Sequence, residues 1–348
     1  MTVAAAETGH VGAPLLLAVD GNSLLHRAYH AGLDQGVTDD AGRPVWAVRG
    51  MVSFVARAAA RLRPDAVLIG FDCSRESHRK ADFPGYKAHR PPKPGDLVEQ
   101  LEVAPALLAD AGFSVVVPPG CEADDVLASG AARARAAGWR SVVVTSDRDA
   151  FQLIDATTSV LRVMNGGMDA SPILTADTVR EVCGVPADRY RDFAALRGDP
   201  SDNLPGVHGV GGTIAARLLT AFDTAAAVYE ALDGGAEAAI RKAAGRRVPA
   251  QLREAAAREN VLRNQRLMTM RTDVPIPDLD AMRVPLDRDV VRAALSARGI
   301  HLGPSLWALT GGSRPPDPDA MAALSMFAPL RRGRRTARVP GEGQLALF

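Results

Sequence analysis

Nine carboxylates recur along the chain at positions where they could hold metal ions. Several follow apolar runs directly, as at the ends of residues 15–20, 66–72 and 142–147. An acid buried at the end of such a run costs free energy unless a cation compensates its charge. Mg²⁺ is the natural compensator, because it takes carboxylate oxygens and retains several waters. The nine predicted ligands are Asp20, Asp72, Glu122, Asp124, Asp125, Asp147, Asp149, Asp199 and Asp202.

Three of these acids open a predicted helix. Glu122, Asp124 and Asp125 stand at the start of a helical pattern that spans residues 123–137. Acids at a helix N-terminus also favour the helix dipole, by about 0.3–1 kcal/mol. One acid would be enough for that purpose, and an E-x-D-D triplet repels itself without a cation. We therefore favour metal binding over a role confined to the helix terminus.

Short apolar strands alternate with longer helices in the first half of the chain. This order is typical of a parallel sheet with helices on both faces, so we predict an α/β fold with a mostly parallel central sheet. Ligands gather beyond the carboxyl ends of such strands, where Asp20, Asp72 and Asp147 fall. The strands are expected at 15–20, 66–71, 114–117 and 141–145, and the helices include 46–62, 97–110 and 123–137.

The composition is that of an ordinary globular protein. Of the 348 residues, 47% are hydrophobic and 23% are charged, and the net charge is +1. No apolar run approaches the roughly 20 residues that span a bilayer, and no signal peptide is recognisable, so we expect a cytoplasmic protein without membrane contact. Cys73, Cys121 and Cys183 form no CxxC pair, which argues against zinc and disulfides.

A basic segment at residues 74–95 follows the strand that carries Asp72. It is rich in lysine, arginine and proline and has few core-type residues, so it is not a core strand. One interpretation is a solvated loop, because such stretches are often disordered. The other is a functional loop, because long loops inside compact domains usually carry function.

From about residue 173 the pattern becomes mostly helical, which predicts a second domain. Within it, residues 206–212 (GVHGVGG) form a predicted hairpin in front of a helix. Such a turn exposes backbone N–H groups that can hold phosphate oxygens, although its glycines can equally serve left-handed backbone geometry. The helices are expected at 175–183, 186–197, 213–221, 224–232, 236–244 and 249–264.

Residues 301–343 are expected to form a linker and a basic tail, and the chain ends in QLALF at 344–348. Apolar residues behind a flexible tail have no core to join. A pocket on a partner protein is the natural hypothesis for them.

Five segments of the chain resemble, in order, the signatures of the bacterial 5′–3′ exonucleases. These are the amino-terminal domains of DNA polymerase I and their free-standing relatives in the flap endonuclease superfamily. The segments are LLLAVDGNSLLHRAYHA, FD…YKAHRPPKP, CEADDVLA, TSDRDAFQL and RGDPSDNLPGVHGVG. The resemblance covers about residues 14–290 and implies a free-standing nuclease. It further implies a PIN-like core at 14–172 with a basic helical arch at 74–96, and a helical domain at 173–300 with a helix-hairpin-helix at 203–222.

The resemblance also divides the acids into two metal clusters, which would hold two Mg²⁺ ions, or Mn²⁺ as a substitute. The first cluster is Asp20, Asp72, Glu122, Asp124 and Asp125, and the second is Asp147, Asp149, Asp199 and Asp202. Two such ions can activate water and stabilise the leaving oxygen of a phosphodiester. Arg27, Lys87 and Arg90 are expected at the scissile phosphate. The expected DNA-binding residues are His26, Arg79, Tyr86, Gly206, Gly209, Gly211 and Arg217, with a possible K⁺ ion at the hairpin.

The chain departs from the family pattern at three places. His26 replaces a tyrosine that stacks on a base, and imidazole offers less area for stacking. Residues 212–215 (GTIA) replace the usual Glu-Lys-Thr-Ala, which removes a lysine expected near downstream phosphate; Arg148 replaces a lysine and keeps its charge. The terminal QLALF resembles the pentapeptide that binds the bacterial sliding clamp, with Gln344, Leu345, Leu347 and Phe348 at the characteristic positions.

The sequence thus predicts a Mg²⁺-dependent 5′–3′ exonuclease and flap endonuclease. Its expected substrates are DNA with a 5′ flap, a nick or a free 5′ end, and RNA primers in duplex, during primer removal and repair. A PIN-type metal-dependent RNase is one alternative, and it would lack the arch and the hairpin. A non-catalytic, clamp-bound scaffold that recognises DNA junctions is the other, and the intact acids argue against it.

Overall fold

The computed structural model describes residues 12–34, 36–73 and 77–314. The expected clamp-binding residues Gln344, Leu345, Leu347 and Phe348 lie outside the described residues, as does the basic tail before them. Within the described part, no helix has the length and apolar character needed to cross a membrane.

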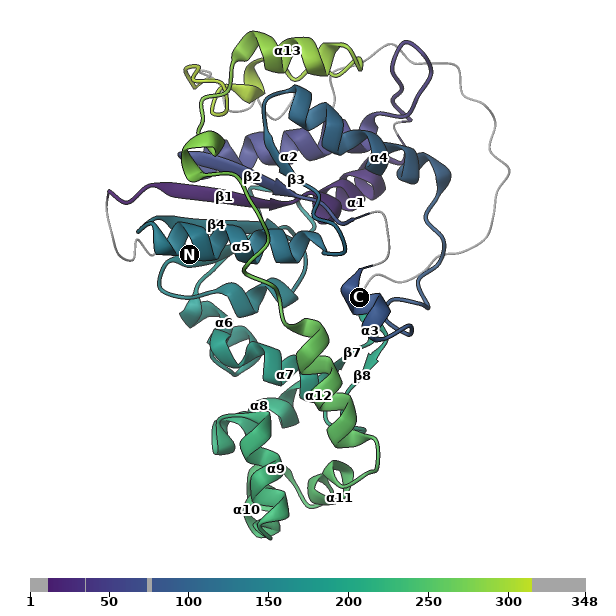
Figure 1. The fold of residues 1–348 in the computed structure, drawn as a ribbon, viewed down its shortest axis with the longest axis vertical. Coiled ribbons are helices and arrows are strands. Elements are labelled where there is room, and N and C mark those ends of the chain that lie inside the picture. Colours follow the sequence, from purple (N-terminus) through teal and green to yellow (C-terminus); the bar gives the residue numbers. More distant parts are fainter. Residues whose placement is uncertain (1–11, 35, 74–76, 315–348) are drawn as a thin grey trace.

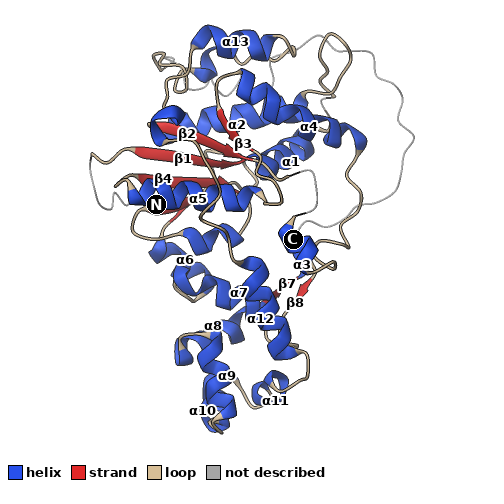
Figure 2. Cartoon of the chain, viewed as in Figure 1, coloured by secondary structure: helices blue, strands red, loops and turns tan. Residues whose placement is uncertain are grey.

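A six-stranded sheet has the strand order β3-β2-β1-β4-β5-β6. Figures 1 and 2 show its strands β1, β2, β3 and β4 above the helical part of the molecule. All neighbouring strands pair in parallel except the edge strand β6, which is antiparallel to β5. The predicted α/β fold with a mostly parallel sheet is therefore confirmed. The strands are β1 (Leu15–Asp20), β2 (Ala66–Gly70), β3 (Ser114–Val116), β4 (Arg140–Thr145), β5 (Thr158–Arg162) and β6 (Ile173–Leu174).

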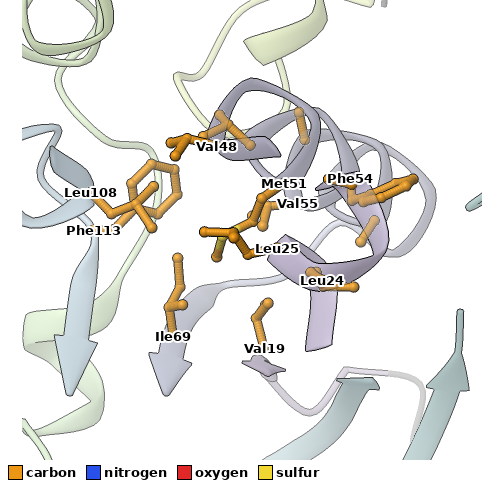
Figure 3. Close-up of a cluster of buried hydrophobic side chains, with 14 of the residues drawn as sticks. Val19, Leu24, Leu25, Val48, Met51, Phe54, Val55, Ile69, Leu108 and Phe113 are labelled. Atoms are coloured by element: carbon orange, nitrogen blue, oxygen red, sulfur yellow. The ribbon is translucent and has the colours of Figure 1, made fainter. Parts of the chain in front are cut away.

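Side chains alternate between the two faces of the sheet, as the pleat of a strand requires. Along β1, Leu15, Leu17 and Val19 enter one hydrophobic cluster, whereas Leu16 and Ala18 enter clusters on the opposite face. Figure 3 shows the first of these clusters, between the sheet and its covering helices. That face is covered by α1 (Gly21–Gly32), α2 (Trp46–Leu62) and α4 (Gly95–Asp110), and the other by α5 (Ala123–Ala136).

A helical lobe extends from one side of the sheet (Figure 1). We expected one helix at 249–264, but the structure divides it into two, because the chain turns between Leu252 and Ala257, which are both buried in the core of the lobe. The lobe consists of α6 (Ala176–Cys183), α7 (Tyr190–Arg197), α8 (Gly212–Phe222), α9 (Ala225–Asp233), α10 (Glu237–Ala244), α11 (Val248–Leu252) and α12 (Ala257–Met268).

After α12 the chain returns to the hydrophobic cluster between the sheet and α1, α2 and α4. The helical domain was predicted to extend to residue 300, and this boundary needs correction. Helix α13 (Arg288–Ser296) packs against α4. Leu302, Leu306 and Leu309 are buried in the cluster that α1, α2 and α4 share. A linker that begins at 301 was therefore wrong for this stretch, because apolar side chains spaced three or four residues apart bury one face.

The predicted helix-hairpin-helix at 203–222 also needs correction. The helix before the hairpin is α7, and a short antiparallel pair, β7 (Gly198–Asp199) and β8 (Leu204–Pro205), stands between α7 and the hairpin. The pair depends on glycine, because a Cβ at Gly198 or Gly206 would collide with the backbone of the other. This pair carries Asp199 and encloses Asp202 in a 3₁₀ turn, Pro200–Asp202.

Candidate metal centre at the sheet edge

Asp20 and Asp72 lie side by side at the carboxyl edge of the sheet, because Asp20 is in register with Gly70. Asp20 caps α1, accepting from the Ser23 N–H at 2.8 Å and from Thr145 Oγ1 at 2.7 Å. Asp72 accepts from Asn22 Nδ2 at 3.0 Å and from the Ala123 N–H at 2.9 Å. Both acids are thus oriented by donors from other elements.

Burial makes ionisation of these carboxylates costly. Burial raises the pKa of Asp20 to about 7, and the charges of Asp72 and Asp147 add to the effect against the hydrogen bond from Ser23. Burial likewise raises the pKa of Asp72. A cation placed here would lower both values by favouring the charged forms.

Asp124 and Asp149 carry the strongest demand for a cation. In the part of the chain that the structure describes, no hydrogen bond or ion pair reaches either carboxylate. Burial raises the pKa of both well above the usual range, and the nearby charge of Asp147 raises it further. Hard, partly buried carboxylate oxygens without a donor are suitable ligands for a divalent ion such as Mg²⁺.

Glu122 is compensated by the chain itself. It accepts from Ser77 Oγ at 2.9 Å, from Tyr86 OH at 3.2 Å and from Lys87 Nζ at 2.8 Å. Burial alone would raise the pKa of Glu122, but the charges of Lys87 and Arg79 outweigh burial and hold it below its usual value. The side chain therefore stays ionised.

The remaining acids stand on short local turns. Asp147 accepts from the Asp149 N–H at 2.9 Å, and Asp199 accepts from the Ser201 N–H at 2.8 Å. Asp202 accepts from Arg90 Nη2 at 2.7 Å, and burial raises its pKa against the charges of Lys87 and Arg90.

Lys87 joins the two sets of acids. Its Nζ lies 2.8 Å from Glu122 Oε2 and 3.9 Å from Asp202 Oδ2. The Lys87 backbone has the left-handed φ of +56°, which is uncommon for a residue with a side chain, and its N–H donates to the Asp202 carbonyl at 3.0 Å. Lys87 and Arg90 of the predicted arch therefore lie against the acids, although residues 88–95, including Arg90, are exposed. The same segment contains α3 (His78–Asp82).

Three predicted assignments do not match the geometry. Asp125 and Arg79 form a buried ion pair with two 2.8 Å hydrogen bonds, so neither has a free face for metal or DNA. Burial would raise the pKa of Asp125, and Arg79 holds it low instead. The Tyr86 ring is only 5% exposed and packs in the core of the helical lobe, so it does not face DNA. A basic or aromatic residue can contact DNA only when the fold leaves its side chain exposed.

The two residues predicted on α1, His26 and Arg27, are partly exposed. Burial and the positive charges of Lys93, His30 and Arg90 lower the pKa of His26 to about 4, so its ring is neutral near pH 7. Arg27 donates from Nη2 to Asn165 Oδ1 at 2.9 Å.

The predicted hairpin residues occupy the turn before α8. Gly209 has φ of +71°, where a side chain would be strained and would also meet the Gln251 amide. Gly211 caps α8, and nothing lies near the position of an added Cβ. Arg217 is exposed on the same helix. The exposed Arg217 therefore lies on the helix that follows the turn.

Sequence reasoning missed the neutral residues that orient the acids. Asn22, Ser77 and Thr145 donate to Asp72, Glu122 and Asp20. The sequence offers only two hints of these roles. Thr145 stands two residues before Asp147, and Asn22 stands two residues after Asp20. Their partners are 45 to 125 residues away in the chain.

The side chains are of the type that binds a divalent metal ion, but their oxygens do not lie close enough together to coordinate one. Among residues 12–34, 36–73 and 77–314, no set of three His, Cys, Asp or Glu side chains has the spacing of a metal site. The pKa values of Asp20, Asp124 and Asp149 are raised by burial and, to a lesser extent, by a neighbouring carboxylate. The ion itself would have to bring their oxygens to ligand distance.

Two family models match the chain in succession. The 5′-3′ exonuclease, N-terminal resolvase-like domain matches residues 15–184, and the 5′-3′ exonuclease, C-terminal SAM fold matches residues 185–288. The chain belongs to the 5′–3′ exonuclease family.

Curated relatives include bacterial DNA polymerases I. The chain is 34% identical over 291 residues to the enzyme of Mycobacterium tuberculosis, covering 83% of the chain and 31% of the polymerase. It is 38% identical over 266 residues to that of Pseudomonas aeruginosa, covering 76% of the chain and 28% of the polymerase. The chain therefore spans less than a third of the length of these relatives.

Solved structures share the fold at low identity. The T5 5′-exonuclease with divalent metal ions (zinc) bound has a TM-score of 0.56 and 17% identity, covering 89% of this chain and 97% of that one. The catalytic core of Rad2 in complex with DNA substrate has a TM-score of 0.51 and 15% identity, covering 82% and 87%. At these identities the likeness concerns the fold.

Proposed function

We propose that this protein is a Mg²⁺-dependent, structure-specific 5′–3′ exonuclease and flap endonuclease. It hydrolyses phosphodiester bonds of DNA at 5′ ends, flaps and nicks. The observation that carries the proposal is the meeting of two carboxylate groups at one edge of the sheet, with Lys87 between them. Membership of the 5′–3′ exonuclease family supports it.

Eight acids would hold the metal in this proposal. Two ions supply charge neutralisation at the phosphate and an activated water at neutral pH. Mn²⁺ would substitute, because it accepts the same oxygen ligands. Asp20, Asp72, Glu122 and Asp124 would serve the first ion, and Asp147, Asp149, Asp199 and Asp202 the second.

Lys87 and Arg90 would act on the scissile phosphate. In this structure their partners are Glu122 and Asp202. Once metal neutralises these acids, both cations become free to turn to phosphate oxygens, where they stabilise charge in the transition state. Arg27 would add a third cation, and His26 would stack on the neighbouring base.

The hairpin before α8 would hold the duplex. Its backbone N–H groups and Arg217 suit phosphate contacts, which position an enzyme without reading sequence. A K⁺ ion at the hairpin would share the phosphate charge. Rad2, which has a related fold, was solved in complex with DNA substrate, and this supports a DNA substrate here.

RNA primers in duplex are a second proposed substrate, because the hydrolysis needs no contact with the sugar 2′ position. The chain-terminal Gln344, Leu345, Leu347 and Phe348 would bind the bacterial sliding clamp. Such a tether raises the local concentration of enzyme at DNA without adding contacts to the site. Primer removal and repair are the processes that these substrates define.

Product analysis on a 5′-labelled flap tests the proposal. With Mg²⁺ or Mn²⁺ we expect short labelled products cut near the flap junction, and with EDTA we expect none. A structured RNA without a 5′ flap serves as the comparison substrate. Cleavage of that RNA without flap cutting would contradict the proposal and favour a PIN-type RNase.

A further inference from the structure

The carboxylate of Asp125 is fully used within the protein. Its two oxygens accept from Arg79 Nη2 and Nη1, both at 2.8 Å. They also accept from the N–H of Arg271 at 2.9 Å and of Glu122 at 3.0 Å. An ionised carboxylate offers about four acceptor positions. With four donors and only 2% exposure, Asp125 has no lone pair left for a metal ion.

Arg79 is used almost as completely. Besides Asp125, its Nε donates to the Leu267 carbonyl at 2.8 Å and its Nη2 to the Thr269 carbonyl at 3.3 Å. Its side chain is 11% exposed. The planar guanidinium makes this two-pronged contact in a fixed geometry that an ammonium group does not reproduce. Arg79 therefore has little to offer a DNA strand.

The pair joins three elements that are far apart in the chain. Arg79 belongs to α3 at the base of the arch, Asp125 to the first turn of α5, and Leu267 to the end of α12. Past the base of the arch, Tyr86 and Lys87 both donate to Glu122. The ion pair therefore sets where the arch begins, relative to the acids that Lys87 must reach.

The neighbouring acid behaves in the opposite way. Asp124 has no hydrogen bond or ion pair among the described residues. Successive residues on a helix point about 100° apart, so Asp124 and Asp125 cannot face the same ion from one turn. Asp125 instead turns back to complete the capping box of α5 with Glu122.

We propose that Asp125 and Arg79 form a positioning tie, in place of a metal ligand and a DNA contact. The tie holds the base of the arch and the end of α12 against the start of α5, and so places Lys87 over the metal centre. This inference rests on the proposed nuclease function, because it assigns roles within that site.

Metal stoichiometry separates the two acids. Mn²⁺ would be titrated into metal-free protein and counted by electron paramagnetic resonance, with Asp124→Asn as the matched control for Asp125→Asn. We expect Asp125→Asn to bind as many ions as the parent and Asp124→Asn to lose one. Loss of an ion from Asp125→Asn would overturn the inference. A parent that binds no Mn²⁺ would instead contradict the proposed function, and the next measurement would still decide the tie.

Thermal unfolding of the metal-free variants gives the second test. Asp125→Asn leaves a buried arginine without its charge partner, so we expect a lower Tm. Asp124→Asn removes a repelled carboxylate, so we expect a higher Tm. In Asp125→Asn, amide hydrogen exchange should also quicken in residues 77–87 and 265–271 together. Equal effects of the two substitutions would refute the tie.

A rate measurement shows whether the Asp125–Arg79 pair positions the catalytic groups or only stabilises the fold. Single-turnover cleavage of a 5′ flap would be followed at saturating protein and Mg²⁺, well below the Tm of the variant. For Asp125→Asn and Arg79→Gln we expect a rate about tenfold lower or more, with an unchanged Mg²⁺ midpoint, because displaced catalytic groups lose rate. Arg79→Lys should recover little, since it cannot make the paired contact. A rate equal to the parent's beside a lowered Tm would reduce the pair to a structural contact.

Discussion

The two groups of acids differ in how the fold holds them. Asp20, Asp72 and Glu122 accept hydrogen bonds from side chains 35 to 125 positions away in the chain, on other elements. Asp147 and Asp199 accept from residues only two positions away, within their own turns. Asp20, Asp72 and Glu122 are therefore held by tertiary structure, and Asp147 and Asp199 by local turns. Asp202 is the exception in the second group, because it accepts from Arg90, and Asp124 is the exception in the first, because no donor among the described residues reaches it.

This difference suggests unequal roles for the protein and the metal in building the centre. Donors across the sheet edge orient Asp20, Asp72 and Glu122 before any ion arrives, as a preorganised site requires. The second group contains Asp149, whose pKa burial and three neighbouring acids raise. No hydrogen bond or ion pair among the described residues offsets that repulsion at Asp149. Substitutions of Asp72 and of Asp149 should therefore agree in activity and differ in stability.

The largest expected effect, on the rate of flap hydrolysis, comes from replacing one ligand in each group, and the Tm of the same variants tests the difference between the groups. Asp72→Ala and Asp149→Ala should each lower flap hydrolysis by about 10³-fold, because each removes a ligand from the charge-stabilising centre. In metal-free protein, however, Asp72→Ala should lower the Tm, since Asn22 and the Ala123 N–H lose their acceptor. Asp149→Ala should raise it. Rates and thermal unfolding measured on the same samples check both, and a Tm that falls for both variants would contradict the distinction.

Removal of the bridging cation should have the next largest effect. Lys87→Ala is expected to lower kcat on a 5′ flap by about 10²-fold, through lost stabilisation of the phosphate. Lys80→Ala is the matched control, since Lys80 is exposed in the same segment and should leave the rate near the parent's. Steady-state kinetics on one flap substrate measures both variants. A rate for Lys87→Ala close to that of Lys80→Ala would remove Lys87 from the chemistry.

The difference in pH dependence between the parent and Asp20→Asn probes Asp20 alone. Burial raises the pKa of Asp20 from 3.8 to about 7, so the folded protein keeps a proton that the unfolded chain releases. Between these values the unfolded state binds fewer protons, so stability falls as the pH rises. Without metal, the parent should lose more Tm than Asp20→Asn between about pH 4 and pH 7. Parallel curves for the two proteins would show that Asp20 is already ionised at low pH.

The smallest expected effect concerns duplex binding far from the acids. Arg217→Ala should weaken binding to nicked duplex a few-fold and reduce the salt slope by about 1, as loss of one phosphate contact does. Arg288→Ala on α13 is the control, because it is exposed on the opposite part of the molecule. Fluorescence anisotropy at several salt concentrations measures both. An unchanged salt slope for Arg217→Ala would exclude that contact.

The sequence predicted the sheet and most of the acids for one physical reason. Apolar strands that end in an acid mark both the element and the position of its carboxylate, as at Asp20 and Asp147. Contacts between distant residues leave no such mark, so the burial of Tyr86 and the pairing of Arg79 with Asp125 were not foreseen. For the same reason, the sequence did not predict that Leu302 and Leu306 pack in the cluster between the sheet and α1, α2 and α4.

A crystal structure with Mn²⁺ and a 5′-flap DNA, phased on the anomalous signal of the metal, tests the central claim most directly. We predict two ions about 3.5–4 Å apart, the separation that two-metal hydrolysis requires. Asp124 should ligate the first ion and Asp149 the second, with Asp125 still paired to Arg79. A single ion, or two ions held by one group of acids alone, would contradict the account.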